Sequence, residues 1–226
     1  MLVSIYLPTK NREALLRRAV DSVLAQTHTS LELIVVDDGS TDGTRDILDR
    51  LRTENAPDLR IVFHENNGGK GAALRTGFQH ATGDILVIQD ADLEYSVDDY
   101  PKLLEPFLSQ EAQVVYGSRF LGSIQGMQLP NRIFNILIRW MTNLLFHAHI
   151  TDEATAYKLI KTDVMRSLHL ESQGFEICPE ITAKLLKKKI PIYEVPITYR
   201  ARNQRQGKKI SWKDAFRAVA TLLKYY

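Results

Sequence analysis

Three carboxylates alternate along Asp90-x-Asp92-x-Glu94, directly after an apolar run over Ile85–Gln89. In an extended chain, side chains two residues apart point to the same side, so these carboxylates would present their oxygen atoms together. Hard oxygen ligands suit Mg²⁺ or Mn²⁺, and magnesium commonly shares its coordination shell with phosphate oxygens. A metal held there would neutralise the charge of a departing diphosphate. A solvated acidic turn is the alternative, but the position after a buried type of strand favours metal binding.

Other polar segments that could contact a nucleotide also follow apolar runs. They are Pro8-Thr9-Lys10-Asn11-Arg12, Asp37-Asp38-Gly39-Ser40, Asn66-Asn67-Gly68-Gly69-Lys70-Gly71 and Gly117-Ser118-Arg119. Lys70 is a candidate phosphate ligand, and the flanking glycines permit close backbone approach. A solvated lysine at a helix start and aspartates that merely form turns are the alternatives. The glycine signatures of dinucleotide-binding folds and of P-loops are both absent, which argues against those two classes.

The elements that must position these residues follow an α/β pattern. Short β-rich runs alternate with helical patterns and predict a mainly parallel sheet flanked by helices. The expected strands are Val3–Leu7, Leu31–Val36, Arg60–Phe63, Ile85–Gln89 and Gln113–Tyr116. Asn11 is the expected N-cap of the first helix, with Glu13 in its first turn. Because ligands bind beyond the carboxyl ends of strands in open α/β sheets, the polar segments should converge on one edge.

The second half is expected to contain helices and two more strands. The segment Gly117–Leu129, with Gly122 and Gly126, suits a mobile loop before a helix that begins near Asn131. Further strands are expected at Thr155–Ile160 and Ile192–Tyr199, with helices at Thr162–Leu168 and Pro179–Lys189. The last segment, 211–226, opens with a capping-box-like start and continues as an amphipathic helix.

Composition narrows the function classes further. A hydrophobic content of 44% supports a buried core, and a net charge of +2 does not resemble the basic footprint of a nucleic-acid binder. The single cysteine, Cys178, and the lack of a secretory signal at the start predict a reducing, cytoplasmic location. The apolar stretch Ile133–Ile150 is too polar and too short to span a bilayer, so any contact with a membrane should be peripheral.

Two stretches, Val35–Thr44 and Asp90-Ala-Asp92, resemble family 2 glycosyltransferases of the GT-A fold. Further segments resemble one branch of this family, the dolichyl-phosphate mannose synthases and polyprenyl-phosphate glucosyltransferases. These are Gly117-Ser118-Arg119-Phe120, Asn131-Arg132, Tyr157-Lys158, Phe175-Glu176, Glu180-Ile181, Arg202 and Gly207-Lys208-Lys209. The branch usually carries Tyr-Asn-Glu after the first proline, whereas this chain has Lys10-Asn11-Arg12-Glu13, as in members that glycosylate saccharides.

The resemblance implies a Rossmann-like GT-A domain over 1–210, followed by the amphipathic helix 211–226 as a candidate for the membrane interface. Residues 1–120 would form the nucleotide-sugar and metal half, and 121–210 the acceptor half. The residues implied for the donor are Pro8, Thr9, Asn11, Asp37, Asp38, Lys70, Asp90 and Asp92. Asp92 and Glu94 would ligate Mg²⁺ or Mn²⁺. Arg119 would steady the diphosphate, and Arg132, Arg202 and Lys209 would hold the acceptor.

These assignments predict an inverting transfer of a hexose from GDP-mannose or UDP-glucose to a polyprenyl or dolichyl phosphate. A phosphate monoester has its second pKa near 6 and needs no general base at neutral pH. What it needs instead is cations, because an anionic acceptor must approach an anionic donor.

Two alternatives remain open at this point. The acceptor could be a saccharide hydroxyl with Glu176 or Glu180 as general base, or the protein could be a nucleotide-sugar-binding module without turnover. The helices near 131–149 and 211–226 could place Trp140, Phe146, Trp212 and Tyr225 in a lipid headgroup region. They could equally pack on the core.

Overall fold

The computed structural model describes residues 1–54, 57–109, 112–201 and 212–226, and the side chain of Trp212 lies outside this description. The strands are β1 (Val3–Thr9), β2 (Leu31–Asp38), β3 (Leu59–His64), β4 (Ile85–Ile88), β5 (Val114–Gln125), β6 (Lys158–Lys161) and β7 (Tyr193–Arg200). The helices are α1 (Glu13–Leu24), α2 (Thr44–Thr53), α3 (Lys70–His80), α4 (Tyr100–Ser109), α5 (Leu129–Phe146), α6 (Thr162–Ser167), α7 (Ile177–Lys187) and α8 (Trp212–Tyr225). A short 3-10 turn, Val97–Asp99, precedes α4.

The strands form one sheet in the order β3-β2-β1-β4-β6-β5-β7. Strands β1 to β4 are parallel, and β7 is parallel to β5, whereas β6 is antiparallel to both β4 and β5. The expected α/β architecture with a mainly parallel sheet is therefore confirmed. Each of the seven predicted strand positions overlaps an observed strand.

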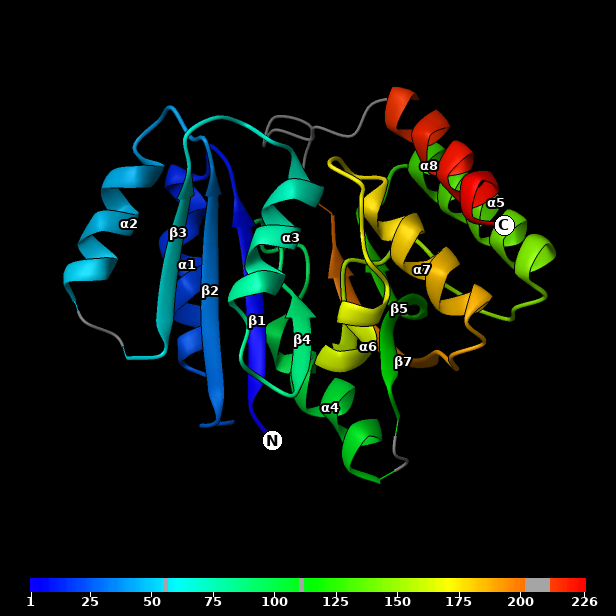
Figure 1. Ribbon diagram of the computed structural model, residues 1–226, viewed down its shortest axis with the longest axis horizontal. Helices are drawn as coiled ribbons and strands as arrows, with labels where there is room; N and C mark the ends of the chain where they lie inside the picture. Colours follow the sequence, from blue (N-terminus) through cyan, green and yellow to red (C-terminus); the bar gives the residue numbers. More distant parts are fainter. Residues whose placement is uncertain (55–56, 110–111, 202–211) are drawn as a thin grey trace.

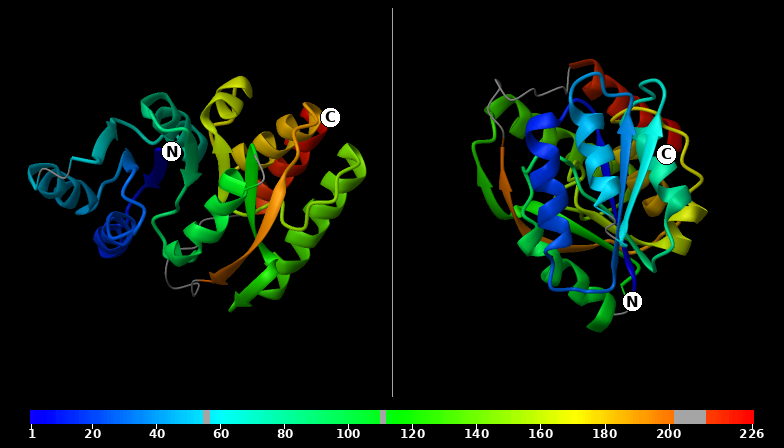
Figure 2. Two further views of the ribbon diagram at one scale, coloured as in Figure 1. Left: turned by 90° about the horizontal axis from the view of Figure 1, so that it is seen from below. Right: turned by 90° about the vertical axis from the view of Figure 1, so that its left-hand side faces the viewer.

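Helices cover both faces of this sheet (Figure 1, Figure 2). Residues of β1 alternate between the two core clusters, with Ile5 and Leu7 on one side and Tyr6 on the other, as the period of two along a strand requires. Apolar residues of α1, α2 and α4 complete the first cluster, and those of α3, α6 and α7 complete the second. The sheet is thus buried on both faces, so ligands must bind where its strands end.

At the end of the molecule opposite α2, α5 and α8 lie beside α7 (Figure 1). Ile138 of α5 and Leu222 of α8 are buried in a small third cluster, against which Phe146 and Tyr225 pack. These last two side chains therefore contribute to the core. Within the described ranges, no helix is both long enough and apolar enough to cross a lipid bilayer.

Two local predictions were wrong. The segment Gly117–Leu129 is not a loop, because β5 continues to Gln125. Gly122 lies so close to β7 that a Cβ atom there would stand 2.0 Å from the Ile197 carbonyl oxygen. The glycine therefore marks a close approach of two strands at an irregular register.

Asn11 does not cap α1. It adopts a left-handed conformation, with φ of 50°, and its side-chain oxygen accepts a hydrogen bond from the Thr41 backbone nitrogen at 2.9 Å. Arg12 stands at the N-cap position, and Glu13 is in the first turn as expected. Asn11 thus connects the loops that follow β1 and β2.

Candidate active site

Polar residues from several strands meet at one edge of the sheet, where β1, β2 and β4 end. Because β6 runs antiparallel to β4, the residues that precede β6 reach this same edge. One contact demonstrates the meeting: the Tyr157 hydroxyl donates a 2.7 Å hydrogen bond to the side chain of Gln89, directly after β4. The site therefore combines segments that follow parallel strands with a segment that precedes an antiparallel one.

Asp38 organises the glycine-rich loop between β3 and α3. Its two carboxylate oxygens accept hydrogen bonds of 2.8 Å from the backbone nitrogens of Gly68 and Gly69. The imidazole of His64 contacts the same carboxylate at 2.9 Å. With these partners in place, Asp38 positions the loop.

At the glycine-rich loop, the backbone lies close to another segment of this chain, the one before α7. A Cβ at Gly69 would lie 2.5 Å from the Gln173 carbonyl oxygen, and one at Gly71 would lie 2.4 Å from that of Ser172. The Ala72 backbone nitrogen also donates to the Gln173 carbonyl oxygen at 3.1 Å. The glycines thus allow the segment before α7 to pack on the start of α3.

Two buried polar atoms at the ends of β1 and β2 have no hydrogen-bond partner in the described part of the chain: Asp37 Oδ1 and Thr9 Oγ1. The two residues are register partners in the sheet. The other Asp37 oxygen accepts from Arg45 Nε at 2.8 Å, which fixes the carboxylate. Since buried polar groups in native proteins are normally satisfied, these atoms are candidates to bind a ligand.

Lys70 and Asp90 form an ion pair within the site. Lys70 Nζ lies 2.7 Å from Asp90 Oδ1 and 2.8 Å from Oδ2, so it contacts both carboxylate oxygens. Burial is the largest single influence and by itself would lower the pKa of Lys70, but the charge and hydrogen bond of Asp90, with the nearby Cys178 and Asp92, together raise it. The ring of Phe175 lies 5.8 Å from the ammonium. Lys70 is therefore a charged group at the start of α3.

Asp92 and Glu94 lie next to β7. The Glu94 backbone nitrogen donates to Asp92 Oδ1 at 3.1 Å, and the Tyr199 hydroxyl donates to Glu94 Oε2 at 2.9 Å. The Arg200 backbone nitrogen donates to the Glu94 carbonyl oxygen at 2.9 Å. These contacts fix the acidic segment after β4 against the end of β7.

The donor set fits a divalent cation that arrives with a diphosphate. No group of three His, Cys, Asp or Glu residues suited to a metal occurs within the described ranges. The Asp90 carboxylate is paired with Lys70, and Asp92 and Glu94 are the other two carboxylates of the motif. One or two carboxylates completed by phosphate oxygens and water are typical of Mg²⁺ sites in proteins.

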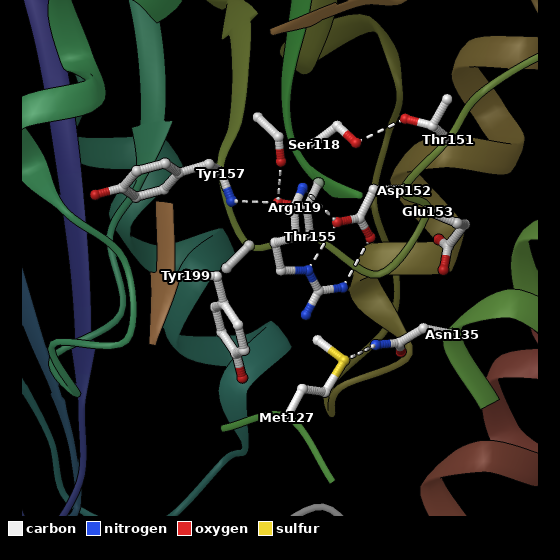
Figure 3. A network of polar contacts seen from close by, with 12 residues as sticks. Ser118, Arg119, Met127, Asn135, Thr151, Asp152, Glu153, Thr155, Tyr157 and Tyr199 are labelled. Carbon is white, nitrogen blue, oxygen red and sulfur yellow. Dashed lines mark hydrogen bonds and ion pairs between the residues drawn. The ribbon is translucent and has the colours of Figure 1, made fainter. Parts of the chain in front are cut away.

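Arg119 and Asp152 form the most enclosed ion pair of the site (Figure 3). The guanidinium donates from Nε and Nη2 to the two Asp152 oxygens, each at 2.7 Å, and the Arg119 backbone nitrogen donates at 2.9 Å. The Tyr199 ring lies 5.2 Å from the guanidinium carbon. Burial opposes the charge of Arg119, yet the neighbouring Tyr95 and Asp152 raise its pKa. The guanidinium Nε and Nη2 are thus directed at Asp152, and the expected contact of Arg119 with a diphosphate stays a prediction.

Beside this pair lie two further buried ionisable groups, Glu153 and Lys158. Lys158 Nζ donates to the Glu153 carbonyl oxygen at 2.7 Å and lies 3.8 Å from the centre of the Tyr116 ring. Burial raises the pKa of Glu153 and lowers that of Lys158. Each shift favours the neutral form of its group.

Asp152, Glu153 and Tyr199 were not predicted as site residues. The predicted site residues were those that follow parallel strands, whereas Asp152 and Glu153 precede an antiparallel strand. The sequence offered one signal for them: two adjacent carboxylates, Asp152 and Glu153, stand just before the expected strand Thr155–Ile160.

Of the three basic residues expected at the acceptor, the structure describes Arg132. Arg132 is exposed on the first turn of α5. Arg202 and Lys209 lie outside the described residues.

The two candidate bases differ in their surroundings. The Glu180 carboxylate is buried and accepts hydrogen bonds from the backbone nitrogens of Glu171 and Ser172 and from Lys184. It therefore holds the segment before α7 and is poorly placed to act as a base. Glu176 accepts from the Gly174 backbone nitrogen at 3.0 Å, and its second oxygen is buried without a partner in the described chain.

Comparison with known proteins identifies the class. The chain belongs to glycosyl transferase family 2, whose family model matches residues 4–168. It is similar to the UDP-N-acetylglucosamine--dolichyl-phosphate N-acetylglucosaminyltransferase of Methanococcus voltae, with 29% identity over 87% of this chain and 84% of that protein. It is also similar to the low-salt glycan biosynthesis hexosyltransferase Agl6 of Haloferax volcanii, with 28% identity over 98% of this chain and 53% of that protein.

Solved structures agree on the fold. Glucosyl-3-phosphoglycerate synthase from Mycobacterium tuberculosis, in complex with Mn²⁺, uridine diphosphate and phosphoglyceric acid, gives a TM-score of 0.76 at 21% identity. That likeness covers 99% of this chain and 78% of the other. The same enzyme with Mg²⁺ and uridine diphosphate gives a TM-score of 0.74 at 20% identity. The expected GT-A fold is confirmed.

Proposed function

We propose that this glycosyltransferase transfers a hexose or N-acetylhexosamine from a nucleotide-sugar to a polyprenyl or dolichyl phosphate. The observation that carries the proposal is the similarity to the dolichyl-phosphate N-acetylglucosaminyltransferase. It covers 87% of this chain, more than the stretch matched by the family model, and therefore includes part of the region beyond residue 168. Residues 1–120 would bind the donor, and 121–210 would bind the acceptor.

The donor half supplies groups of suitable chemistry. The unpartnered atoms of Asp37 and Thr9 are suited to a base or ribose, which carry donors and acceptors of their own. Lys70 is a partly buried cation suited to a phosphate, and Asp90 holds its ammonium in place. Pro8 lies near the end of β1, and Asn11 lies in the loop that follows it. The relatives support a uridine nucleotide as the first donor to test, with GDP-mannose as the alternative.

A divalent metal would be held by Asp92 and Glu94 together with the donor diphosphate. Mg²⁺ or Mn²⁺ bound there would neutralise the charge of the leaving group. The Tyr199 hydroxyl holds Glu94, and the Glu94 backbone nitrogen holds Asp92, so both carboxylates have a fixed orientation. The presence of Mn²⁺ or Mg²⁺ in the complexes of the structural neighbours supports this proposal.

A phosphate acceptor suits the carboxylates of the site. Both oxygens of Asp152 accept hydrogen bonds from Arg119, and the Glu180 carboxylate is occupied by three partners. A phosphate oxygen is already nucleophilic at neutral pH and requires no proton acceptor. It would attack the anomeric carbon opposite the departing diphosphate, which inverts the configuration. Arg132, Arg202 and Lys209 remain the proposed acceptor ligands.

The saccharide-acceptor alternative rests on Glu176, whose second carboxylate oxygen is buried without a partner in the described chain. A general base at this position would give a rate that falls on acidification and is lost in Glu176→Gln. In either case, the proposed location is the cytoplasmic face of a membrane, where a lipid-linked acceptor would be reached from the membrane surface.

The test is a matrix of donors and acceptors, each with MgCl₂ or MnCl₂. UDP-N-acetylglucosamine, UDP-glucose and GDP-mannose are each incubated with a polyprenyl phosphate, with an oligosaccharide and with no acceptor, and the products are identified by mass spectrometry. A glycosylated lipid phosphate supports the proposal. A glycosylated oligosaccharide favours the Glu176 mechanism, and intact donor in every reaction would favour a binding module.

A further inference from the structure

One face of α5 is apolar and exposed along the whole helix. Its members are Leu129, Ile133, Ile136, Leu137, Trp140 and Leu144, whose side chains are between 38% and 68% exposed. At 3.6 residues per turn, these six positions fall within an arc of about 100°. We call this set the α5 apolar face. Ile138 and Thr142, on the opposite side of the helix, are buried.

The interior of the protein therefore accounts for only part of the apolar surface of α5. Ile138 packs with Leu222 of α8 and Ala183 of α7, so the helix already has its partners on that side. Contiguous exposed apolar surface on a folded protein commonly marks a site of protein or membrane contact. The α5 apolar face needs an explanation beyond folding.

The charges on α5 indicate the occupant. Within Leu129–Phe146, the ionisable residues are Arg132 and Arg139, and no Asp or Glu occurs. On the helical projection, both arginines fall along one border of the α5 apolar face. Phe120 lies 5.8 Å from the Arg139 guanidinium. Apolar side chains bordered by cations, with no acidic residues, suit the surface of a bilayer that contains anionic phospholipids.

The start of α5 also borders the active site. Asn135 Nδ2 donates to Met127 Sδ at 3.8 Å, and Figure 3 places both residues next to Arg119. Met127 packs against the core cluster that contains Tyr199. A bilayer seated on α5 would therefore lie beside the site, within the reach of a lipid-linked phosphate.

We infer that the α5 apolar face seats the protein on the headgroup region of an anionic phospholipid bilayer. The inference rests on the proposed function for its biological purpose, but binding to vesicles can be measured without any sugar transfer. It also separates the earlier candidates for membrane contact. Trp140 belongs to the α5 apolar face, whereas Phe146 and Tyr225 belong to the core.

The test measures binding of the full chain to phosphatidylcholine vesicles with and without phosphatidylglycerol, by sedimentation. Wild type should bind the anionic vesicles. Leu137→Glu should weaken binding by at least about tenfold, because it removes one apolar side chain from contact with the bilayer and adds a charge that anionic lipids repel. Leu108→Glu on α4 is the matched control, because Leu108 is 71% exposed and lies outside the α5 apolar face. This control should bind as wild type does.

A second measurement locates the contact on α5. The chain has two tryptophans, so Trp212→Phe leaves Trp140 as the only reporter. Its fluorescence should shift to shorter wavelength when anionic vesicles are added and should stay unchanged with phosphatidylcholine alone. Failure of wild type to bind, or an unshifted Trp140 spectrum on binding, would overturn the inference.

Two controls separate this inference from the proposed function and from a dimer. Leu137→Glu should retain its melting temperature and its transfer rate to a short-chain acceptor dispersed without vesicles. If it does not fold, Leu144→Ser replaces it in the same assays. Light scattering that shows a wild-type dimer dispersed to monomers by Leu137→Glu, without vesicle binding, would assign the face to a second copy and overturn the inference.

Discussion

Asp152 holds Arg119 through three hydrogen bonds, two from the guanidinium at 2.7 Å and one from the backbone nitrogen at 2.9 Å. The pair connects the middle of β5 with the segment before β6. Tyr199 contacts Arg119 through its ring and Glu94 through its hydroxyl. The acidic motif after β4 is therefore connected to the buried ion pair through one side chain of β7.

Asp152→Ala should lower the free energy of unfolding by about 3 to 5 kcal/mol, because it leaves the Arg119 charge buried and unpaired. Urea denaturation measures this change. The double variant Arg119→Met/Asp152→Ala should recover part of the lost stability, because neither charge of the pair remains. Asp21→Ala is the control: it removes an exposed pair with Arg17 and should change stability by less than about 1 kcal/mol. Equal losses in the single and double variants would contradict this account.

Gly71→Ala should lower the melting temperature and weaken nucleotide binding, because its Cβ would lie 2.4 Å from the Ser172 carbonyl oxygen. The segment before α7 would have to move away from α3. Gly126→Ala serves for comparison: its Cβ meets nothing nearer than 3.5 Å, and φ is 73°. That change should affect stability by about 1 kcal/mol through backbone strain alone and leave nucleotide binding intact. Thermal melts with and without nucleotide distinguish the two effects.

Glu153→Gln should become increasingly stabilising relative to wild type as pH rises above the ordinary range of a glutamate. Burial raises the pKa of Glu153 in the folded protein, against the charges of Lys158 and Arg119 that lower it. A raised folded-state pKa means that the folded protein binds the proton more tightly, so wild type loses this stability as the carboxyl ionises. Urea titrations of both proteins from pH 4 to pH 8 measure the difference. A difference that is constant over this range would contradict the assignment.

Asp92→Ala should reduce sugar transfer by about a thousandfold, because loss of a metal carboxylate removes several kcal/mol of charge stabilisation. The far-ultraviolet circular dichroism spectrum should stay unchanged. Asp98→Ala is a matched control, because Asp98 is an exposed carboxylate in the same loop region. Full transfer by Asp92→Ala, with an unaltered response to added metal, would remove Asp92 from the metal site.

The sequence was sufficient to predict the sheet and the place of several polar residues at the ends of its strands. Apolar runs placed Lys70 after β3 and Asp90 after β4, where the structure has them, and Asp37 and Asp38 form the end of β2. Tertiary contacts decided what sequence patterns could not. Gly122 looked like part of a loop, because nothing local reveals that a second strand passes within contact distance.

The acceptor side was predicted less well, for a topological reason. Asp152 reaches the site because β6 runs antiparallel to β4, and strand direction cannot be read from the sequence of a four-residue strand. Likewise, the ion pair of Arg119 with Asp152, 33 residues further along the chain, was not predicted from the sequence, and the expected contact of Arg119 with a diphosphate stays a prediction. Pairings at such separation depend on the completed fold.

The most direct test of the central claim compares a polyprenyl phosphate with the corresponding polyprenol as acceptors of radiolabelled sugar, each with Mg²⁺ or Mn²⁺ and with a chelator. A metal-assisted transfer to phosphate predicts metal-dependent label in the lipid phosphate and none in the alcohol. Label in the alcohol, or equal transfer in the presence of chelator, would contradict a metal-assisted transfer to phosphate.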